Sequence, residues 1–397
     1  MPIARRDLLL GAFASPLLAV PNPPKLKITG LELFVVKVNH RGNWIFLRLQ
    51  SDKGVTGIGE ASHGILDPRK DAPMAGVIKS FHALVEGESP FQIEQYRKRG
   101  WAKAKAGGRP GITGFSGIEQ ALWDMCGRAL GIPVYDMLGG KLRDELNVYA
   151  NINRATNDDR GPAGFAANAK LVVADGFKAV KGAPFDGVPP LTSSRAEINK
   201  EVNIGVKCVE AMREAIGLNV DLLIDCHSHF DVKMAIDVAK RLEPMRLYWY
   251  EEPVDPEQLE DTKAIASAIR QKLSGGEVFF GKDAFAKLTR SGALAVIMPD
   301  VKHCGGILEA HKIAAVAEVD GTLVSPHNPS GPVATAASVQ ICASIPNFSI
   351  LEFAWGEASW RSEVITPPEQ FRNGAIAVPA APGLGIELNE RAIKAHS

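Results

Sequence analysis

The sequence predicts an α/β protein in which a (β/α) barrel accompanies a second, smaller domain. Three acidic residues, Asp225, Glu251 and Glu277, recur at equal intervals, and each follows an apolar run with the character of a strand. The stretches between them have the spacing of helices, as in residues 232–242. One strand and one helix in each interval is the repeat of a (β/α) barrel, whose strand ends bring such residues to one face.

The segment before the barrel has the pattern of a small antiparallel sheet followed by helices. Its strand-like parts are residues 27–37, 44–50 and 55–62. Residues 39–42 and 51–54 separate them, and each of these turns ends in the glycine that hairpins favour. Helical spacing follows and is clearest in residues 118–130. A meander followed by helices forms a unit of its own and does not continue a barrel.

Strand-like and helix-like segments alternate from Leu146 to about Ile365, and this stretch is the predicted barrel. From Pro367 onward the chain is rich in proline and glycine and the alternation stops, so we expect it to leave the barrel and pack back on the first domain. The predicted division is a leader over residues 1–24, an α+β capping domain over 25–145, the barrel over 146–365 and a C-terminal segment over 366–397.

The first residues have the pattern of a targeting signal. Arg5 and Arg6 precede an uncharged, mostly apolar run over residues 8–20, which is too short to span a bilayer but fits a signal peptide. The paired arginines resemble a twin-arginine leader, which predicts export to the periplasm. The nearest candidate cleavage site, residues 17–19, is not a clean one. Without export, the protein is cytoplasmic and residues 1–24 are an untargeted tail.

Composition excludes several classes of function. The chain has 397 residues, enough for one barrel and a smaller domain, and its 46% apolar and 23% charged residues are typical of a soluble globular protein. Lys+Arg and Asp+Glu both total 45, so no basic excess supports a nucleic-acid or membrane partner. None of the five cysteines forms a CxxC pair, which argues against a disulfide framework or a thiolate zinc site.

Three carboxylates that converge on one face indicate a site for a hard cation. Oxygen ligands are those that Mg²⁺ prefers, so Asp225, Glu251 and Glu277 predict a Mg²⁺ site. Without a cation, neighbouring carboxylates repel one another and resist ionisation. The alternative, three unrelated surface acids, does not explain their equal spacing or their place after strand-like runs.

Histidines accompany these acids. His227 lies two residues after Asp225, so on one strand both side chains would point the same way. An imidazole there is placed either to transfer a proton to a metal-bound substrate or only to orient the carboxylate. Asp300 and His327 each end a strand-like run, and if these strands are neighbours, Asp300 would hold His327 in one tautomer and make it a base. Glu352 ends a further run with an acid.

Longer motifs extend this pattern over nearly the whole chain after the leader. Two lie in the first domain and four in the barrel: residues 117–124, 133–140, 225–227, 250–254, 299–306 and 326–332. With these motifs the chain resembles the enolase superfamily in its mandelate racemase and muconate lactonizing enzyme branch. Within that branch it is most similar to D-galactonate dehydratase and related acid-sugar dehydratases.

The resemblance has implications for the fold, the cofactor and the partners. It implies a modified TIM barrel of the (β/α)7β type with an N-terminal α+β capping domain. It implies that Asp225, Glu251 and Glu277 bind Mg²⁺. It also implies a homo-oligomer whose partner is a small sugar acid, with no role for nucleic acid or membrane.

In such dehydratases the matching positions have defined catalytic roles. The resemblance implies that His227 is the general acid and that His327, paired with Asp300, is the general base. Glu352 would hydrogen-bond the substrate carboxylate as it becomes an enediolate. His327 would remove the proton at C2, and His227 would help the C3 hydroxyl leave as water, which gives a 2-keto-3-deoxy acid.

One position departs from other members of the superfamily. Many racemases and cycloisomerases have a K-x-K pair on the second barrel strand, with the second lysine as a base. Here Lys181 occupies the first place and Ala183 the second, and alanine cannot accept a proton. A histidine mechanism therefore remains. Lys181, and His303 just beyond the strand that ends in Asp300, are candidate substrate-binding residues.

These inferences lead to a Mg²⁺-dependent dehydratase of a sugar acid, either an aldonate or an aldarate. Two alternatives stay open. An epimerase, racemase or cycloisomerase would use the same enediolate, with two histidines exchanging protons on opposite faces. A non-catalytic sugar-acid binding protein would keep the barrel but would have no use for a histidine–aspartate pair. No motif names the diastereomer.

Overall fold

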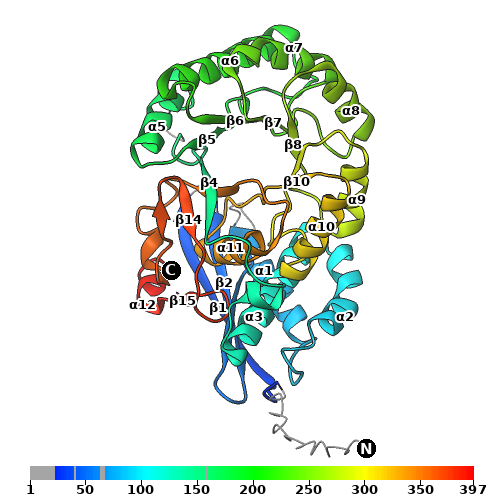
Figure 1. Cartoon of the computed structure of the whole chain (residues 1–397), viewed down its shortest axis with the longest axis vertical. Coiled ribbons are helices and arrows are strands. Elements are labelled where there is room, and N and C mark those ends of the chain that lie inside the picture. Colours follow the sequence, from blue (N-terminus) through cyan, green and yellow to red (C-terminus); the bar gives the residue numbers. More distant parts are fainter. Residues whose placement is uncertain (1–22, 40–41, 63–67, 157–158) are drawn as a thin grey trace, which may run out of the picture.

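The structure, a computed structural model, describes residues 23–39, 42–62, 68–156 and 159–397 (Figure 1). The leader predicted over residues 1–24 falls almost entirely outside these ranges. None of the helices within them combines the length and the apolar character that crossing a membrane needs.

The first domain begins with an antiparallel sheet in the order β1–β2–β3. Its strands are β1 (Ile28–Asn39), β2 (Gly42–Ser51) and β3 (Thr56–Glu60). The helices that follow are α1 (Pro68–His82), α2 (Ile93–Ala106), α3 (Gly108–Leu130) and α4 (Val134–Met137). The meander predicted from the sequence is confirmed, and the strand ends differ from the prediction by one or two residues.

Parallel strands form the barrel, which occupies the other end of the molecule in Figure 1. They are β4 (Glu145–Asn151), β5 (Ala179–Gly182), β6 (Asp221–Asp225), β7 (Trp249–Glu251), β8 (Leu273–Gly275), β9 (Val296–Ile297), β10 (Leu323–Val324) and β11 (Leu351–Ala354). Each strand pairs with the next from β4 to β10, and β11 pairs with β4. A parallel bridge between Val324 and Phe348 completes the ring.

A helix follows each barrel strand except the last in the described chain. These helices are α5 (Pro162–Ala174), α6 (Arg195–Ile216), α7 (Val232–Leu242), α8 (Leu259–Ala268), α9 (Lys282–Arg290), α10 (Ile307–Val319) and α11 (Pro332–Ser344). After β11 comes only a 3₁₀ turn at Arg361–Glu363. The predicted (β/α)7β barrel is therefore confirmed. Its interior is filled by buried side chains from several strands, including Tyr149 of β4, Leu223 of β6 and Trp249 of β7.

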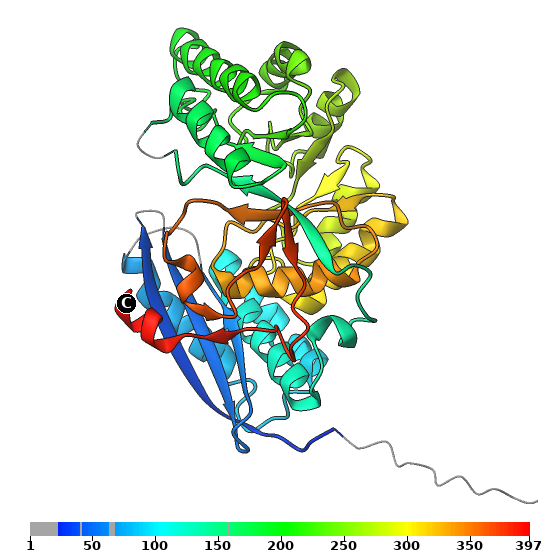
Figure 2. The same cartoon turned by 60° about the vertical axis from the view of Figure 1, so that its left-hand side comes forward.

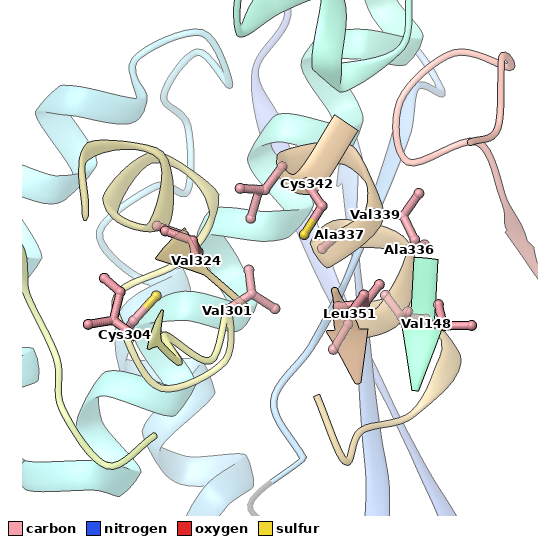
Figure 3. Close-up of a cluster of buried hydrophobic side chains, with 14 of the residues drawn as sticks. Val148, Val301, Cys304, Val324, Ala336, Ala337, Val339, Cys342 and Leu351 are labelled. Atoms are coloured by element: carbon pink, nitrogen blue, oxygen red, sulfur yellow. The ribbon is translucent and has the colours of Figure 1, made fainter. Parts of the chain in front are cut away.

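Helix α11 covers the place where the barrel closes. Leu351 of β11 and Val148 of β4 are register partners, and both are buried. Figure 3 shows these two side chains next to each other, with Ala336 and Val339 of α11 beside them. This apolar contact shields the junction between the first and last strands from water, where ladder hydrogen bonds would otherwise compete with solvent.

The C-terminal segment runs back along the first domain (Figure 2). It contains β12 (Ile365–Thr366), β13 (Phe371–Arg372), β14 (Ala375–Ala377), β15 (Glu387–Leu388) and α12 (Glu390–Ala395). Strand β14 pairs antiparallel with β4, and the backbone N–H of Lys37 donates to His396 O at 2.8 Å. The segment thus joins the first barrel strand to the sheet of the first domain. The exact domain limits stay a prediction.

Helix α3 lies against β3 at a distance that only glycine allows. A Cβ on Gly57 would lie 2.1 Å from Ala121 O, and one on Gly59 would lie 2.1 Å from Gly117 O. Such approaches are far shorter than van der Waals contact, so larger residues would push the helix away from the sheet. Residues 111–127 of α3 are buried in this arrangement.

From this buried helix, Glu119 reaches the barrel. Helix α10 starts after Gly306 and receives no hydrogen bond from a side chain of its own N-cap residue. Glu119 supplies the missing acceptors: Oε2 accepts the Ile307 N–H at 2.6 Å, and Oε1 accepts the Leu308 N–H at 2.9 Å. The first N–H groups of a helix have no partner within it, and a carboxylate there also meets the positive end of the helix dipole.

Glu60, at the end of β3, does the same for α11. This helix follows Gly331 and likewise has no side-chain cap from its own sequence. Glu60 Oε1 accepts the Gly331 N–H at 2.8 Å, and Oε2 accepts the Ala334 N–H at 2.8 Å. Ser62 Oγ donates to Glu60 Oε1 at 2.6 Å. Two acids of the first domain therefore cap two barrel helices.

We expect the thermal stability that depends on Glu119 to vary with pH. Burial raises the pKa of Glu119 to about 7, although two backbone N–H groups and Trp123 Nε1–H donate to it. The folded protein therefore binds this proton more tightly than the unfolded chain, whose pKa is near 4.5. The resulting stabilisation is complete below pH 4.5 and is lost as the pH rises through about 7. Relative to Glu119→Gln, which cannot titrate, the wild type should therefore lose Tm over this interval.

Circular dichroism melts of both proteins at several pH values check this expectation. Glu257→Gln, a change of the same kind at an exposed position, is the control. A Tm difference between wild type and Glu119→Gln that stays constant from acid to neutral pH would contradict the expectation.

Candidate active site

The C-terminal ends of the barrel strands open into a cavity of about 220 Å³. Barrel residues line one side, and the first domain lines the other with Trp44, Ser62 and Arg109 among others. Pockets for drug-sized ligands are roughly 300–1,000 Å³, so this one suits a smaller molecule.

The three acids predicted as metal ligands do come together at this cavity. Asp225 ends β6, Glu251 ends β7, and the two are register partners. Glu277 lies two residues beyond β8 and is more exposed than the other two. One carboxylate oxygen from each lies within 4.8 Å of the others, a separation that fits ligands of a single cation.

The electrostatics of the cluster also fit a cation. Burial, and then the neighbouring Asp225 carboxylate, raise the pKa of Glu251 well above its usual range, and Glu277 adds to this. Glu251 therefore loses its proton with difficulty, and a divalent cation bound beside it would stabilise its ionised form. The donor set consists of hard oxygen atoms, which suits a metal such as Mg²⁺ or Mn²⁺ better than a soft one. Asp225, Glu251 and Glu277 thus form a candidate divalent-metal site.

Lys181, predicted as a substrate-binding residue, lies inside this cluster. Its Nζ is 2.8 Å from Glu251 Oε1, 3.2 Å from Glu352 Oε1 and 3.5 Å from Asp225 Oδ2. Burial alone would lower the pKa of Lys181, but Glu251 and Glu352 outweigh it and hold the pKa well above its usual range. Lys181 also lines the cavity, so it contacts both the carboxylates and the space for a ligand.

Glu352 on β11 is fully buried. It is not one of the described residues that line the cavity. Asn151 Nδ2 donates to its Oε1 at 2.6 Å, and the Asn328 N–H donates to its Oε2 at 2.8 Å. With Lys181 also bound to Oε1, both oxygens have partners. A hydrogen bond from Glu352 to a substrate carboxylate would require one of these contacts to change.

Asp300 and His327 are adjacent because β9 and β10 pair side by side. His327 Nδ1 lies 2.8 Å from Asp300 Oδ2, and His327 Nε2 lies 3.3 Å from Glu277 Oε2. Lys302, which the sequence analysis missed, donates its Nζ to both oxygens of Asp300, at 2.7 and 3.0 Å. Burial by itself would raise the pKa of Asp300, but Lys302 and His303 outweigh it and hold that pKa well below its usual range.

His227 reaches the same cavity by a different route from the predicted one. Strand β6 ends at Asp225, so the expectation that strand alternation aligns His227 with Asp225 is wrong. His227 and Ser228 instead adopt left-handed φ angles of 46° and 59°, which residues other than glycine rarely adopt. This turn brings His227 Nε2 to 3.1 Å from Asp225 Oδ2.

The same turn pairs His227 with an acid that the sequence analysis did not identify. His227 Nδ1 lies 2.6 Å from Asp186 Oδ1, and Asp186 Oδ2 lies 2.8 Å from Arg160 Nη2. Asp225, the largest cause, and Asp186 hold the pKa of His227 well above its usual range, although burial by itself would lower it. Asp186 follows β5, so its only sequence signal was an acid a few residues beyond a strand end.

His303, predicted to bind substrate, lines the cavity but also contacts the first domain. Its Nδ1 lies 2.9 Å from Thr113 Oγ1 of α3, and its Nε2 lies 3.8 Å from Asp300 Oδ2. Burial holds the pKa of His303 well below its usual range, against the opposing effect of Asp300. A neutral imidazole in this position can still exchange a hydrogen bond with a ligand.

Two family models match the chain. The model described as enolase C-terminal domain-like matches residues 164–392, and the model described as mandelate racemase / muconate lactonizing enzyme, N-terminal domain, matches residues 30–139. Together they span both the barrel and the sheet-and-helix domain before it.

Individual relatives match over most of their length. The chain is 32% identical to D-xylonate dehydratase of Haloferax volcanii, covering 93% of this chain and 89% of that protein. It is 33% identical to D-galactonate dehydratase of Variovorax paradoxus, covering 93% and 94%. A solved mandelate racemase/muconate lactonizing enzyme from Sulfitobacter sp. superposes with a TM-score of 0.84 at 32% identity, covering 94% and 96%.

We expect the chain to bind one divalent cation through Asp225, Glu251 and Glu277. Because a cation that binds only the folded protein stabilises it, millimolar MgCl₂ or MnCl₂ should raise the Tm of chelator-treated protein. Glu277→Gln removes one anionic ligand, so its affinity should fall by at least about 10-fold. Thermal melts with and without each metal measure the first effect, and titration calorimetry with each metal measures the second. Equal metal affinity in Glu277→Gln and in wild type would remove Glu277 from the site.

Proposed function

The chain belongs to the mandelate racemase and muconate lactonizing enzyme family of the enolase superfamily, and we propose that it is a Mg²⁺-dependent dehydratase of a sugar acid. One observation carries the proposal. Two histidines, each paired with an aspartate, line one cavity, and each contacts a different carboxylate of the metal cluster: His227 contacts Asp225, and His327 contacts Glu277. A site of this kind can remove a proton on one side of a substrate and return one on the other.

The metal ligands Asp225, Glu251 and Glu277 would hold the cation, which supplies Lewis-acid stabilisation of the charge that develops on the substrate carboxylate. Lys181 places a further positive charge at the same end of the cavity. A carboxylate-bearing substrate is thereby oriented with its C1 end toward the strand ends of the barrel.

His327 takes the proton from C2 at its Nε2, because Nδ1 is engaged by Asp300. Asp300 is kept anionic by Lys302, so it can stabilise the positive charge that His327 acquires. Asp300 itself is fully buried, so it acts on the substrate through His327 and through the other hydrogen-bond partners of Asp300.

His227 gives a proton to the C3 hydroxyl, which leaves as water. Asp186 holds the Nδ1 side of its ring, so Nε2 is the atom directed to the metal cluster and the substrate. Loss of the C2 proton and the C3 hydroxyl leaves an enol, and its tautomerisation gives a 2-keto-3-deoxy acid. The atoms of the product differ from those of the substrate by one water.

The two histidine pairs also favour a second candidate, an epimerase that exchanges protons at C2. His227 and His327 would then remove and return a proton on opposite faces of one carbon. Dehydration changes the composition of the substrate and epimerisation does not, so product analysis separates them. Export by a twin-arginine leader and assembly into a homo-oligomer belong to the same proposal and rest on the sequence pattern and the family.

The dehydratase proposal predicts keto-acid formation from a small set of substrates. Purified protein with Mg²⁺ is screened against C5 and C6 aldonic and aldaric acids for 2-keto-3-deoxy products. His327→Asn should lower kcat by about 10²- to 10⁴-fold because it lacks the base. His311→Asn on α10, outside the cavity lining, is the matched control. Solvent deuterium incorporation at C2 without water loss would move the assignment to an epimerase.

Asp186 provides a test of the acid. Asp186→Asn should lower kcat by about 10- to 100-fold with little change in KM, because it removes a partner of His227 and no contact to the metal cluster. Since His327 is untouched, exchange of the C2 proton with deuterated solvent should slow much less than elimination. Asp237→Asn at an exposed site on α7 is the control. Equal slowing of exchange and elimination would show that Asp186 serves the fold and not His227.

A further inference from the structure

One wall of the cavity, formed by the loops after the first and last barrel strands, carries a network of charges. Arg154, after β4, and Glu357, after β11, both line the cavity. Arg154 Nε lies 2.8 Å from Glu357 Oε1, and Arg361 Nη1 lies 3.5 Å from Glu357 Oε2. Arg361 in turn lies 2.7 Å from Glu369. The positive charges of two arginines and the negative charges of two glutamates thus cancel. This part of the wall therefore has no net charge that would attract an ionic ligand.

Arg109, near the start of α3, is different. It lines the same cavity, and its Nε, like that of Arg154, is shielded from solvent without a hydrogen bond of good geometry, but Arg154 has an ion pair with Glu357. Among the residues whose side chains the structure describes, which leaves out 68–72, no carboxylate forms an ion pair with the guanidinium of Arg109. Its charge acts inside the cavity, because burial, Lys302 and Arg109 all lower the pKa of His303. Shielding a donor of a charged group without a partner costs free energy that an anionic ligand would restore.

The other cationic side chains of the cavity are already engaged. Lys181 is held by Glu251, Glu352 and Asp225, and Lys302 by Asp300. Arg109 is therefore the cation that remains available to a ligand among the described residues of the lining.

We propose that Arg109 binds a second anionic group of the substrate, so that the preferred sugar acid is negatively charged at both ends. The inference rests on the proposed function, in which the metal cluster holds the first carboxylate. With that end fixed at the barrel strands, the chain of the sugar acid extends toward the first domain, where α3 presents Arg109.

The chemistry of the guanidinium specifies the class of ligand. Its fork of N–H donors matches the two oxygens of a carboxylate or of a phosphate. An aldaric acid has a second carboxylate at its far end, and an aldonic acid phosphorylated there has a phosphate. A simple aldonic acid has only a hydroxyl, which leaves the charge of Arg109 unmatched. The chain would then differ in its preference from relatives that are named for aldonic acids.

The test compares kcat/KM of the Mg²⁺-loaded enzyme for three sets of C6 acids: aldaric acids, aldonic acids and aldonic acid 6-phosphates. The variants are Arg109→Gln, which removes the charge, and Arg109→Lys, which keeps it. Lys105→Gln, an exposed neighbour on α2, controls for a general loss of positive charge. The wild type should prefer one of the two dianionic sets, and the preferred set tells a carboxylate from a phosphate.

Arg109→Gln should lower kcat/KM for the preferred set by on the order of 100-fold, because it leaves the far anion unpaired in a shielded site. Its effect on aldonic acids should be much smaller, and Arg109→Lys should recover part of the loss. The inference would be overturned if aldonic acids were turned over as efficiently as the dianionic acids, or if Arg109→Gln lowered kcat/KM equally for all three sets. Either result would leave the dehydratase proposal intact.

If no acid of any set is turned over, the proposed function fails and binding decides the inference alone. Calorimetry then uses the Mg²⁺-loaded His327→Asn variant with and without Arg109→Gln. Tighter binding of aldaric acids or 6-phosphates than of aldonic acids, lost in the double variant, supports a second anion site. Equal affinity for all three sets, or no effect of Arg109→Gln, removes it.

Discussion

The site depends on one buried ammonium group, that of Lys181. Asp225, Glu251 and Glu352 come from three different strands, and all three are withdrawn from water. Like charges repel strongly where the dielectric constant is low, so these acids can all ionise there only beside a positive charge. Lys181 supplies that charge from within the chain and contacts all three acids. Glu277, which is more exposed, adds negative charge that the lysine does not contact, and this imbalance is what a metal cation would complete.

The second constraint is the junction between the two parts of the chain. The loops that carry Asp300 and His327 lead directly into α10 and α11, whose N-termini are held by Glu119 and Glu60. The histidine–aspartate pair is therefore placed from both sides: by neighbouring barrel strands beneath and by acids of the first domain above. Because the same domain also presents Arg109 to the cavity, its position affects both the proton transfer and the choice of substrate that we propose.

Much of this arrangement was predictable from the sequence because parallel strands obey simple geometry. Equal intervals placed Asp225 and Glu251 on successive strands, where they are register partners, and neighbouring strand ends brought Asp300 beside His327. His227 does lie at the cavity, but not for the predicted reason. His227 and Ser228 have left-handed φ angles, and the alternation of side chains along a strand does not apply to such a turn.

Contacts between distant loops were not predictable. Asp186 is far from His227 in the sequence, and only the folded loops after β5 and β6 bring the two together. Lys302 and the partners of Lys181 depend in the same way on tertiary packing.

The capping of barrel helices by the first domain has a consequence for synthesis of the chain. Glu60 and Glu119 leave the ribosome long before α10 and α11, the helices whose N–H groups they accept. Both acids are therefore already part of the chain when the last two barrel helices are synthesised, and β11, which pairs with β4 to close the ring, is synthesised after α11. For the same reason, a barrel joined to a foreign N-terminal domain would need acids at the positions of Glu60 and Glu119 to recover its last two helices.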